Sequence, residues 1–193
     1  MMRIITGTAR GVRLKTLEGE ETRPTAERAK EAVFSVIQFE LLGKRVLDAF
    51  AGSGQMGLEA LSRGAERALL VDKNKAAADI IRKNVELTRL GNKAEVICGD
   101  ICDCLKRRSG REQYDIVFLD PPYKSDLIKK ALNCLIENKM LGENSTVICE
   151  SGEPMEVLLK NDRELFDRFK VTKNAKYGVA HVTFMKLSKE TEE

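Results

Sequence analysis

The tetrapeptide Asp120-Pro121-Pro122-Tyr123 combines a carboxylate, a rigid backbone and an aromatic ring. The Asp120 carboxylate and the Pro121 carbonyl can each accept one N–H of an exocyclic amine, since proline lacks the N–H but keeps the C=O. Both acceptors are preorganised because proline fixes φ. Two such hydrogen bonds orient the nitrogen lone pair toward a methyl donor, and Asp120 can take the proton that leaves.

The ring of Tyr123 can stack on a base that is exposed in a loop or taken out of its helix. We therefore predict that Asp120, Pro121, Pro122 and Tyr123 form the catalytic set of an amino-methyltransferase. A rigid turn after a strand is the alternative, but it accounts only for the two prolines. The tetrapeptide alone does not separate adenine N6, cytosine N4, guanine N2 and a glutamine amide.

A glycine-rich turn after Asp48 is the second chemical feature. Glycines at 52, 54 and 57 satisfy G-x-G-x-x-G, and Asp72 stands 20 positions after Gly52. This spacing is the dinucleotide fingerprint, in which the acid binds ribose hydroxyls. A turn that binds nothing would require neither three glycines nor an acid at that place.

Two cofactor classes compete for these glycines. A nicotinamide dinucleotide needs helix N–H groups aimed at its pyrophosphate, and the carboxylate of Asp48 would oppose that anion. S-adenosylmethionine has no phosphate, and its ammonium group can donate to Asp48 directly or through water. The run Asp48-Ala49-Phe50-Ala51-Gly52-Ser53-Gly54 also resembles the first motif of Rossmann-like methyltransferases.

That resemblance implies S-adenosylmethionine as the cofactor. Asp100 stands where that family places an adenine-contacting acid, although an acid after a strand is commonly a helix cap. The expected cofactor contacts are Asp48, Phe50, Ala51, Gly52, Ser53, Gly54, Gly57, Asp72, Lys73, Asp100 and Ile101.

The elements expected around these residues alternate between strand and helix. The alternation predicts an α/β fold with a parallel sheet covered on both faces, and the carboxyl ends of its strands meet at the ligand crevice. Residues 166–172 and 179–187 lie too close in sequence for a helical crossover, so we expect an antiparallel pair. The other expected strands are 3–6, 12–16, 45–48, 67–72, 94–98, 114–120 and 145–150. One expected helix opens at Pro24 with Thr25 as its N-cap, and a second runs from the glycine turn through Leu61. Two further helices are expected at 75–90 and 125–138.

Composition sets further bounds. The 193 residues include 33 Lys and Arg and 30 Asp and Glu, a formal charge of +3. No apolar run approaches the ~18 residues of a membrane span, and the first residues lack a secretory signal, so we expect a cytoplasmic protein. Residues 1–16 nevertheless hold four basic and no acidic residues. A local basic arm is therefore the expected contact with any nucleic acid.

The five cysteines are odd in number and have no secretory context, so we expect reduced thiols rather than a disulfide framework. Their spacing matches no zinc pattern, and His181 is the only histidine. We therefore expect no metal site. The cysteines are Cys98, Cys102, Cys104, Cys134 and Cys149.

The whole chain resembles the bacterial 16S ribosomal RNA guanine-N2 methyltransferase family known as RsmD. The residues that carry the resemblance are 3–7, 10–14, Arg23-Pro24-Thr25 with Arg28, Glu31 and Phe34, 47–54, 57–65, Asp120 to Tyr123, and Tyr177-Gly178. The chain departs from the family at Asp72, where Glu is more usual, but both acids accept hydrogen bonds from ribose hydroxyls.

The resemblance implies S-adenosylmethionine-dependent methylation of one guanine N2 in 16S rRNA, within the 30S subunit or its assembly intermediate. It also implies a Rossmann-like class I fold with a seven-stranded mixed sheet, an antiparallel last strand and a small N-terminal extension. We expect 1–40 to be a β-hairpin and helix extension on the substrate side, 41–188 to be the methyltransferase domain and 189–193 a frayed tail, in a monomer.

Candidate substrate contacts are Arg10, Arg13, Arg23, Thr25 and Arg28, with a solvated basic face as the alternative. The run Lys106-Arg107-Arg108 is interpreted as a solvated loop. Three other functions stay open: an amino-methyltransferase acting on DNA or protein, an NAD-dependent oxidoreductase, and a non-catalytic RNA-binding assembly factor. The short chain disfavours the DNA enzyme because it leaves no segment for a sequence-reading domain, and no Ser/Tyr/Lys constellation supports the oxidoreductase.

Overall fold

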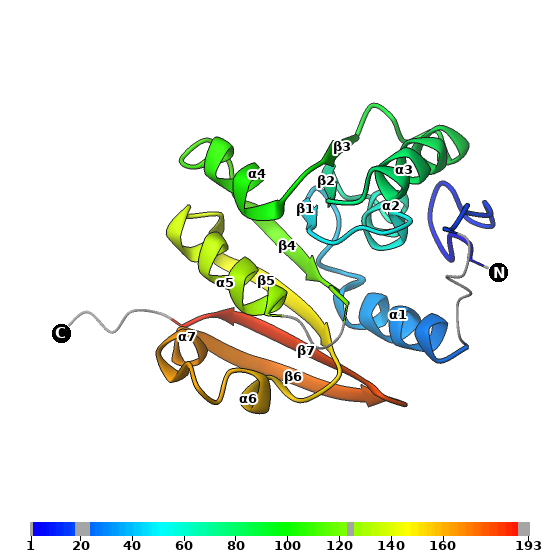
Figure 1. Cartoon of the computed structure of the whole chain (residues 1–193). Coiled ribbons are helices and arrows are strands. Elements are labelled where there is room, and N and C mark those ends of the chain that lie inside the picture. The colour runs from blue at the N-terminus through cyan, green and yellow to red at the C-terminus, as the bar shows by residue number, and fades with distance from the viewer. Residues whose placement is uncertain (1, 18–23, 123–125, 189–193) are drawn as a thin grey trace.

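The computed structural model describes residues 2–17, 24–122 and 126–188, with the backbone alone at 24–27. Arg23, Tyr123 and the expected tail 189–193 lie outside the described residues. Strands and helices alternate along most of the chain (Figure 1). The helices are α1 (Pro24–Ile37), α2 (Gln55–Ser62), α3 (Lys75–Thr88), α4 (Ile101–Arg108), α5 (Leu127–Glu137), α6 (Met155–Leu158) and α7 (Arg163–Asp167). The strands are β1 (Arg45–Asp48), β2 (Arg67–Asp72), β3 (Ala94–Cys98), β4 (Tyr114–Leu119), β5 (Leu141–Ser151), β6 (Phe169–Tyr177) and β7 (Ala180–Leu187).

The described strands form one seven-stranded sheet in the order β3-β2-β1-β4-β5-β7-β6. The first five strands of that order pair in parallel, whereas β7 pairs antiparallel with both β5 and β6. The chain order reverses between β1 and β4, which creates a crevice at their carboxyl ends. The expected mixed sheet of a Rossmann-like class I methyltransferase, with its antiparallel end, is confirmed.

Alternate residues of the strands pack into two separate cores, because successive side chains point to opposite faces of a sheet. Val46, Phe118 and Ile148 belong to the core beneath α1, α2 and α3, and the neighbouring Leu47, Leu119 and Cys149 belong to the core beneath α4 and α5. The helices therefore cover the two faces as separate layers (Figure 1). The same alternation decides on which face of the sheet the side chains at the strand ends lie.

The N-terminal extension is fastened to the first face by buried polar groups. The carboxylate of Glu59, which is fully buried in α2, accepts hydrogen bonds from the backbone N–H groups of Ile5 at 2.7 Å and Thr6 at 3.0 Å. Arg63 pairs with the same carboxylate at 2.7 Å. These contacts satisfy the buried carboxylate of Glu59, which would be costly to leave unpaired in a protein interior, so they hold the extension in a defined place.

Two local predictions in this extension are wrong. Strands 3–6 and 12–16 are replaced by one isolated antiparallel bridge between Arg3 and Arg13, because the backbone of Ile5 and Thr6 bonds to Glu59 instead of to a partner strand. Thr25 is not an N-cap, because α1 already begins at Pro24. Proline suits the first helical position, where its missing N–H costs nothing.

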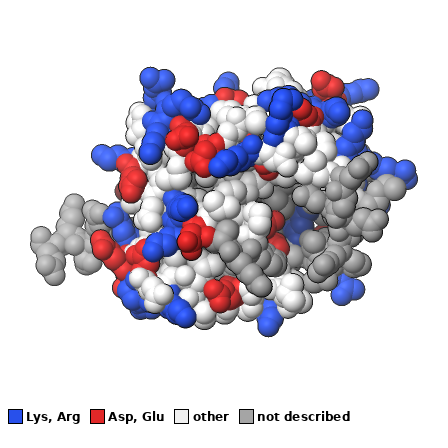
Figure 2. Space-filling view, viewed as in Figure 1, with Lys and Arg blue, Asp and Glu red and all other residues white. Residues whose placement is uncertain are grey.

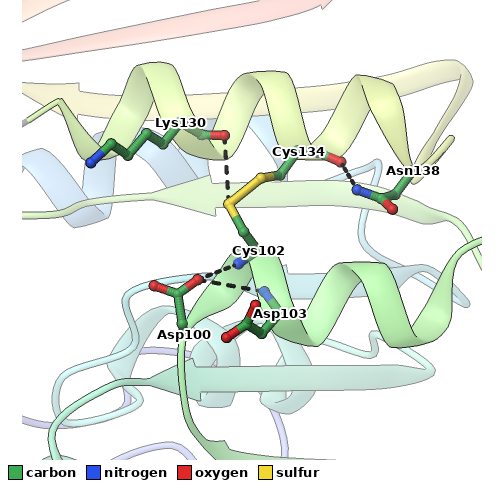
Figure 3. The surroundings of a disulfide bond; sticks show 6 residues. All are labelled: Asp100, Cys102, Asp103, Lys130, Cys134 and Asn138. Carbon is green, nitrogen blue, oxygen red and sulfur yellow. Dashed lines mark hydrogen bonds between the residues drawn. A yellow bond between two sulfur atoms is a disulfide. The ribbon is translucent and has the colours of Figure 1, made fainter.

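The prediction of reduced thiols alone is also wrong. Cys102 of α4 and Cys134 of α5 form a disulfide across a sequence separation of 32 residues (Figure 3). The sheet topology brings these two helices together on the second face, which sequence spacing does not reveal. Cys98, Cys104 and Cys149 are free.

Charges of both signs are interspersed over the face of the molecule seen in Figure 2, as the near balance of acids and bases in the sequence suggests. Among the described residues, no helix is long and apolar enough to cross a membrane.

Candidate functional site

The glycine turn between β1 and α2 depends on the backbone freedom of one glycine and the small volume of another. Gly54 precedes α2 with φ +78°, a left-handed conformation that favours glycine. Gly57 has an ordinary φ, but a Cβ there would lie 2.9 Å from Cδ2 of Leu70 in β2. Gly54 serves the turn, and Gly57 allows α2 to pack closely on the sheet, which is the role of the third glycine in the dinucleotide fingerprint.

Asp48 is the last residue of β1, and its carboxylate lies against the N-terminus of α2. Its Oδ2 accepts the backbone N–H of Gly57 at 2.9 Å, and the residue is only 3% exposed. Burial raises the pKa of Asp48 to about 7, against the lowering effect of the Gly57 hydrogen bond, and the charge of Asp72 raises it further. An anion is stabilised at this helix end, and here the protein supplies that anion itself.

Asp72, the last residue of β2, bonds to the backbone of the glycine turn. Its Oδ2 accepts the N–H of Gly52 at 2.8 Å and its Oδ1 accepts the N–H of Asn74 at 2.8 Å. Each carboxylate oxygen retains a second lone pair, so the group can still receive ribose hydroxyls. The following residue, Lys73, is exposed.

Other predicted cofactor residues take different positions around the turn. Ala51, Ser53 and Gly54 are buried, whereas Phe50 and Gly52 are half-buried. Asp100 caps α4, with Oδ1 accepting the N–H groups of Cys102 at 2.9 Å and Asp103 at 3.4 Å (Figure 3). Asp100 therefore caps the helix, as the alternative interpretation of the sequence expected, and its Oδ2 takes part in neither bond. Ile101 is buried against the second core.

Asn84 is a structural residue of this region that sequence reasoning missed. It is fully buried on α3, and its Oδ1 accepts the N–H of Lys15 at 2.8 Å. Its Nδ2 donates to the carbonyls of Lys15 at 2.9 Å and Ser53 at 2.8 Å. One side chain thus joins the N-terminal extension to the glycine turn, and only the tertiary fold makes that link visible.

The second half of the site follows β4. Asp120 comes directly after Leu119, the last residue of that strand, and next to it Pro121 is buried and Pro122 exposed. Asp120 is accessible to solvent, yet protein surrounds its carboxyl. Desolvation in this setting raises its pKa well above the usual range, and the negative charges of Glu150 and Asp48 raise it further.

The causes of this shift place Asp48 and Glu150 near Asp120. The strand register agrees, because Asp48 pairs with Phe118, two residues before Asp120, and Leu119 pairs with Cys149, one residue before Glu150. Perturbed carboxyl groups at the mouth of a crevice are typical of functional sites. Glu150 was not among the predicted residues, and the signal that could have found it was its position at the end of the neighbouring strand.

A pocket of about 230 Å³ lies between the N-terminal extension, α1 and the start of α2. Among the predicted substrate residues whose side chains the structure describes, only Arg10 lines this pocket; Arg13 and Arg28 lie elsewhere on the extension and on α1. The side chain of Thr25 is not described. The lining residues are Arg3, Ile4, Ile5, Arg10, Gly11, Lys30, Glu31 and Gln55. Gln55 directly follows the glycine turn, so the pocket adjoins the cofactor side of the crevice.

The basic run 106–108 is not the loop that was predicted. It forms the last turn of α4, where Arg108 pairs with Glu95 and Glu112. Basic residues suit this helix end because they oppose the negative pole of the helix dipole. Within the part of the chain that the structure describes, no group of three or more His, Cys, Asp or Glu side chains could hold a metal ion.

Comparison with known proteins identifies the family of the chain. Residues 2–186 match the family model described as conserved hypothetical protein 95. The chain is 37% identical to ribosomal RNA small subunit methyltransferase D of Haemophilus influenzae, covering 78% of each chain. It is 34% identical to the protein of that name from Escherichia coli K12, covering 78% of this chain and 74% of that one.

The fold agrees over a longer stretch. The structure of a hypothetical protein from Thermus thermophilus superimposes with a TM-score of 0.77 at 27% identity, covering 97% of this chain and 100% of that one. The match in sequence therefore extends to the whole architecture. The chain belongs to the conserved hypothetical protein 95 family, and its identity to the ribosomal RNA small subunit methyltransferases D places it in their family as well.

Proposed function

We propose that the protein transfers a methyl group from S-adenosylmethionine to the exocyclic N2 amino group of one guanine in 16S rRNA. The observation that carries the proposal is the position of Asp48 and Asp120 at the ends of the adjacent strands β1 and β4, close enough for the charge of one to raise the pKa of the other. A cofactor held at Asp48 and an amine held at Asp120 would then meet in one crevice.

The cofactor, when bound, supplies an electrophilic methyl group on a positively charged sulfur. Asp48 receives its ammonium group, and Asp72 receives the ribose hydroxyls through the lone pairs that Gly52 and Asn74 leave open. Asp100 and Ile101 border the adenine, and Phe50, Ala51, Ser53, Gly54, Gly57 and Lys73 shape the rest of the site. No pyrophosphate is expected there, since a buried carboxylate occupies the N-terminus of α2.

Asp120 and the carbonyl of Pro121 each accept one N–H of the guanine amine, which points its lone pair at the methyl group. Tyr123 stacks on the base, and Pro122 keeps the acceptors rigid. As the new N–C bond forms, the amine nitrogen becomes acidic and its proton passes to Asp120 or to water. The raised pKa of Asp120 makes its carboxylate a better proton acceptor than an ordinary aspartate.

The substrate side is the N-terminal extension, residues 1–40, facing the methyltransferase domain, residues 41–188. Arg10, Arg13, Arg23 and Arg28, with Thr25, contact rRNA phosphates around the target. Shape and a local basic arm suffice for a base presented on the 30S subunit or its assembly intermediate, which agrees with the small net charge. We propose that the protein acts as a cytoplasmic monomer.

A transfer assay across substrate classes tests the proposal. The protein and radiolabelled S-adenosylmethionine are incubated with small ribosomal subunits, naked 16S rRNA, DNA and a protein extract. Label in small-subunit RNA is the expected result. Label in DNA or protein would contradict it, and binding of NAD in place of S-adenosylmethionine in calorimetry would indicate an oxidoreductase.

A further inference from the structure

Glu150 and Asp120 occupy equivalent positions on two neighbouring strands. The parallel pairs Val117–Val147, Phe118–Ile148 and Leu119–Cys149 bring β4 and β5 into register, and Asp120 and Glu150 are the next residues on each. Backbones of paired strands lie about 4.8 Å apart. Two carboxylates rooted at this spacing can converge on adjacent donors of one molecule.

The alternation of side chains places Glu150 on the face that holds the cofactor site. Ile148, two residues before Glu150, belongs to the core beneath α1 and α2, as does Val182, the residue of β7 with which Glu150 pairs. Asp48 lies on that face too, since it pairs with Phe118 of the same core and bonds to α2. Asp120 follows a residue of the opposite core, so it returns to this face as well.

Glu150 is half-buried, and its negative charge is one of the causes that raise the pKa of Asp120. The two groups therefore interact electrostatically at the place where the amine must lie. Like charges near one another disfavour the ionised form of both carboxyls. A ligand that offers two adjacent N–H donors, one to each group, favours the ionised pair.

The Watson–Crick edge of guanine offers such donors, because N1–H lies beside the N2 amino group. Adenine N1 and cytosine N3 carry lone pairs next to their exocyclic amines, and a carboxylate would repel them. An enzyme site built around an N–H of its substrate rejects analogues that lack it, since its own polar group is then left unpaired.

On the basis of the proposed function, we propose that Glu150 is a specificity-determining residue, which accepts N1–H of the target guanine while Asp120 and the Pro121 carbonyl hold its N2 amine. Glu150 thereby selects guanine over adenine and cytosine. Asp120 orients the reacting nitrogen, and Glu150 contacts only the adjacent ring position.

The test compares guanine with 2-aminopurine, which keeps the N2 amine but has a lone pair at N1. Small subunits are reconstituted with 16S rRNA carrying one or the other base at the methylated position, and kcat/KM is measured for each. The unsubstituted protein is expected to prefer guanine by about tenfold or more. Glu150→Gln, whose amide can donate to N1 of 2-aminopurine, is expected to reduce that ratio by about tenfold.

Glu150→Ala provides a second variant, in which the guanine rate falls and the 2-aminopurine rate changes little. Glu153→Gln is the matched control, because Glu153 is an acid three residues along the chain, and its ratio is expected to stay unchanged. An equal loss of rate on both bases in the Glu150 variants would overturn the inference while leaving the proposed function intact. No transfer to guanine by the unsubstituted protein would overturn the proposed function, and the inference with it.

Discussion

The carboxylate of Asp48 accepts the backbone N–H of Gly57 at 2.9 Å, so the last residue of β1 caps the helix that follows the glycine turn. In a dinucleotide-binding fold the same helix end faces a pyrophosphate. Here that position is taken by a buried acid, which would repel a phosphate and attract a cation. The glycine spacing thus suits both a nicotinamide dinucleotide and S-adenosylmethionine, whereas the hydrogen bond between Asp48 and Gly57 favours S-adenosylmethionine.

Cofactor affinity is expected to depend on the ionisation of Asp48, whose pKa is about 7. A bound ammonium group favours the ionised carboxylate, so affinity for S-adenosylmethionine should rise as the pH rises through this pKa, and binding should release a proton. Asp48→Asn is expected to weaken binding by about tenfold or more and to flatten this pH dependence. Calorimetry in buffers of different ionisation enthalpy measures both effects; equal pH profiles for the variant and the unsubstituted protein would refute the role of Asp48.

Asp120→Ala is expected to lower kcat by at least about 100-fold, the scale seen when one preorganised hydrogen-bonding group is removed from a reacting centre. Affinity for S-adenosylmethionine should stay nearly unchanged, because the Asp48 and Asp72 contacts remain. Single-turnover transfer and calorimetry separate the two quantities. Loss of cofactor binding in this variant would instead assign Asp120 to the cofactor site.

Arginines of the extension are expected to contribute to rRNA affinity through phosphate contacts. Arg10→Ala and Arg28→Ala should each raise KM for small subunits and reduce the slope of log affinity against log salt by about one. Arg107→Ala is the control, because Arg107 lies in the last turn of α4, outside the extension. Equal salt slopes for all three variants would place the RNA contact elsewhere.

The disulfide between Cys102 and Cys134 is expected to stabilise the folded protein by roughly 3–4 kcal/mol, as loop closure over this separation predicts. Cys134→Ser should lower the denaturant midpoint, whereas Cys98→Ser should not, since Cys98 is exposed and free. Thiol titration of the unfolded, unreduced protein should find only Cys98, Cys104 and Cys149. Titration of every cysteine in the protein as purified would contradict the bridge.

Local patterns predict the part of the site that lies at strand ends. Asp48, Asp72 and Asp120 each follow a buried apolar run, and the alternation of strands and helices suffices to place such residues on one edge. Glu150 also lies near the end of a strand, but it becomes relevant only through the register of β5 against β4. The sequence carries no comparable signal for that register.

Contacts between distant parts of the chain account for what sequence reasoning missed. Asn84 bonds to a residue 69 positions away, and Cys102 reaches Cys134 through the packing of two helices. The predicted strand 3–6 fails for the same reason, because the carboxylate of Glu59 accepts the backbone N–H groups of Ile5 and Thr6. Buried polar side chains with remote partners leave no periodic pattern.

The identity of the methylated nucleoside tests the proposed methylation of guanine N2 most directly. Small ribosomal subunits that lack the modification are incubated with the protein and deuteromethyl-labelled S-adenosylmethionine, the RNA is digested, and the nucleosides are separated by mass spectrometry. The proposed reaction yields a single labelled product, N2-methylguanosine, which is expected to disappear with Asp120→Ala. Label in adenosine, in cytidine or at another position of guanosine would contradict it.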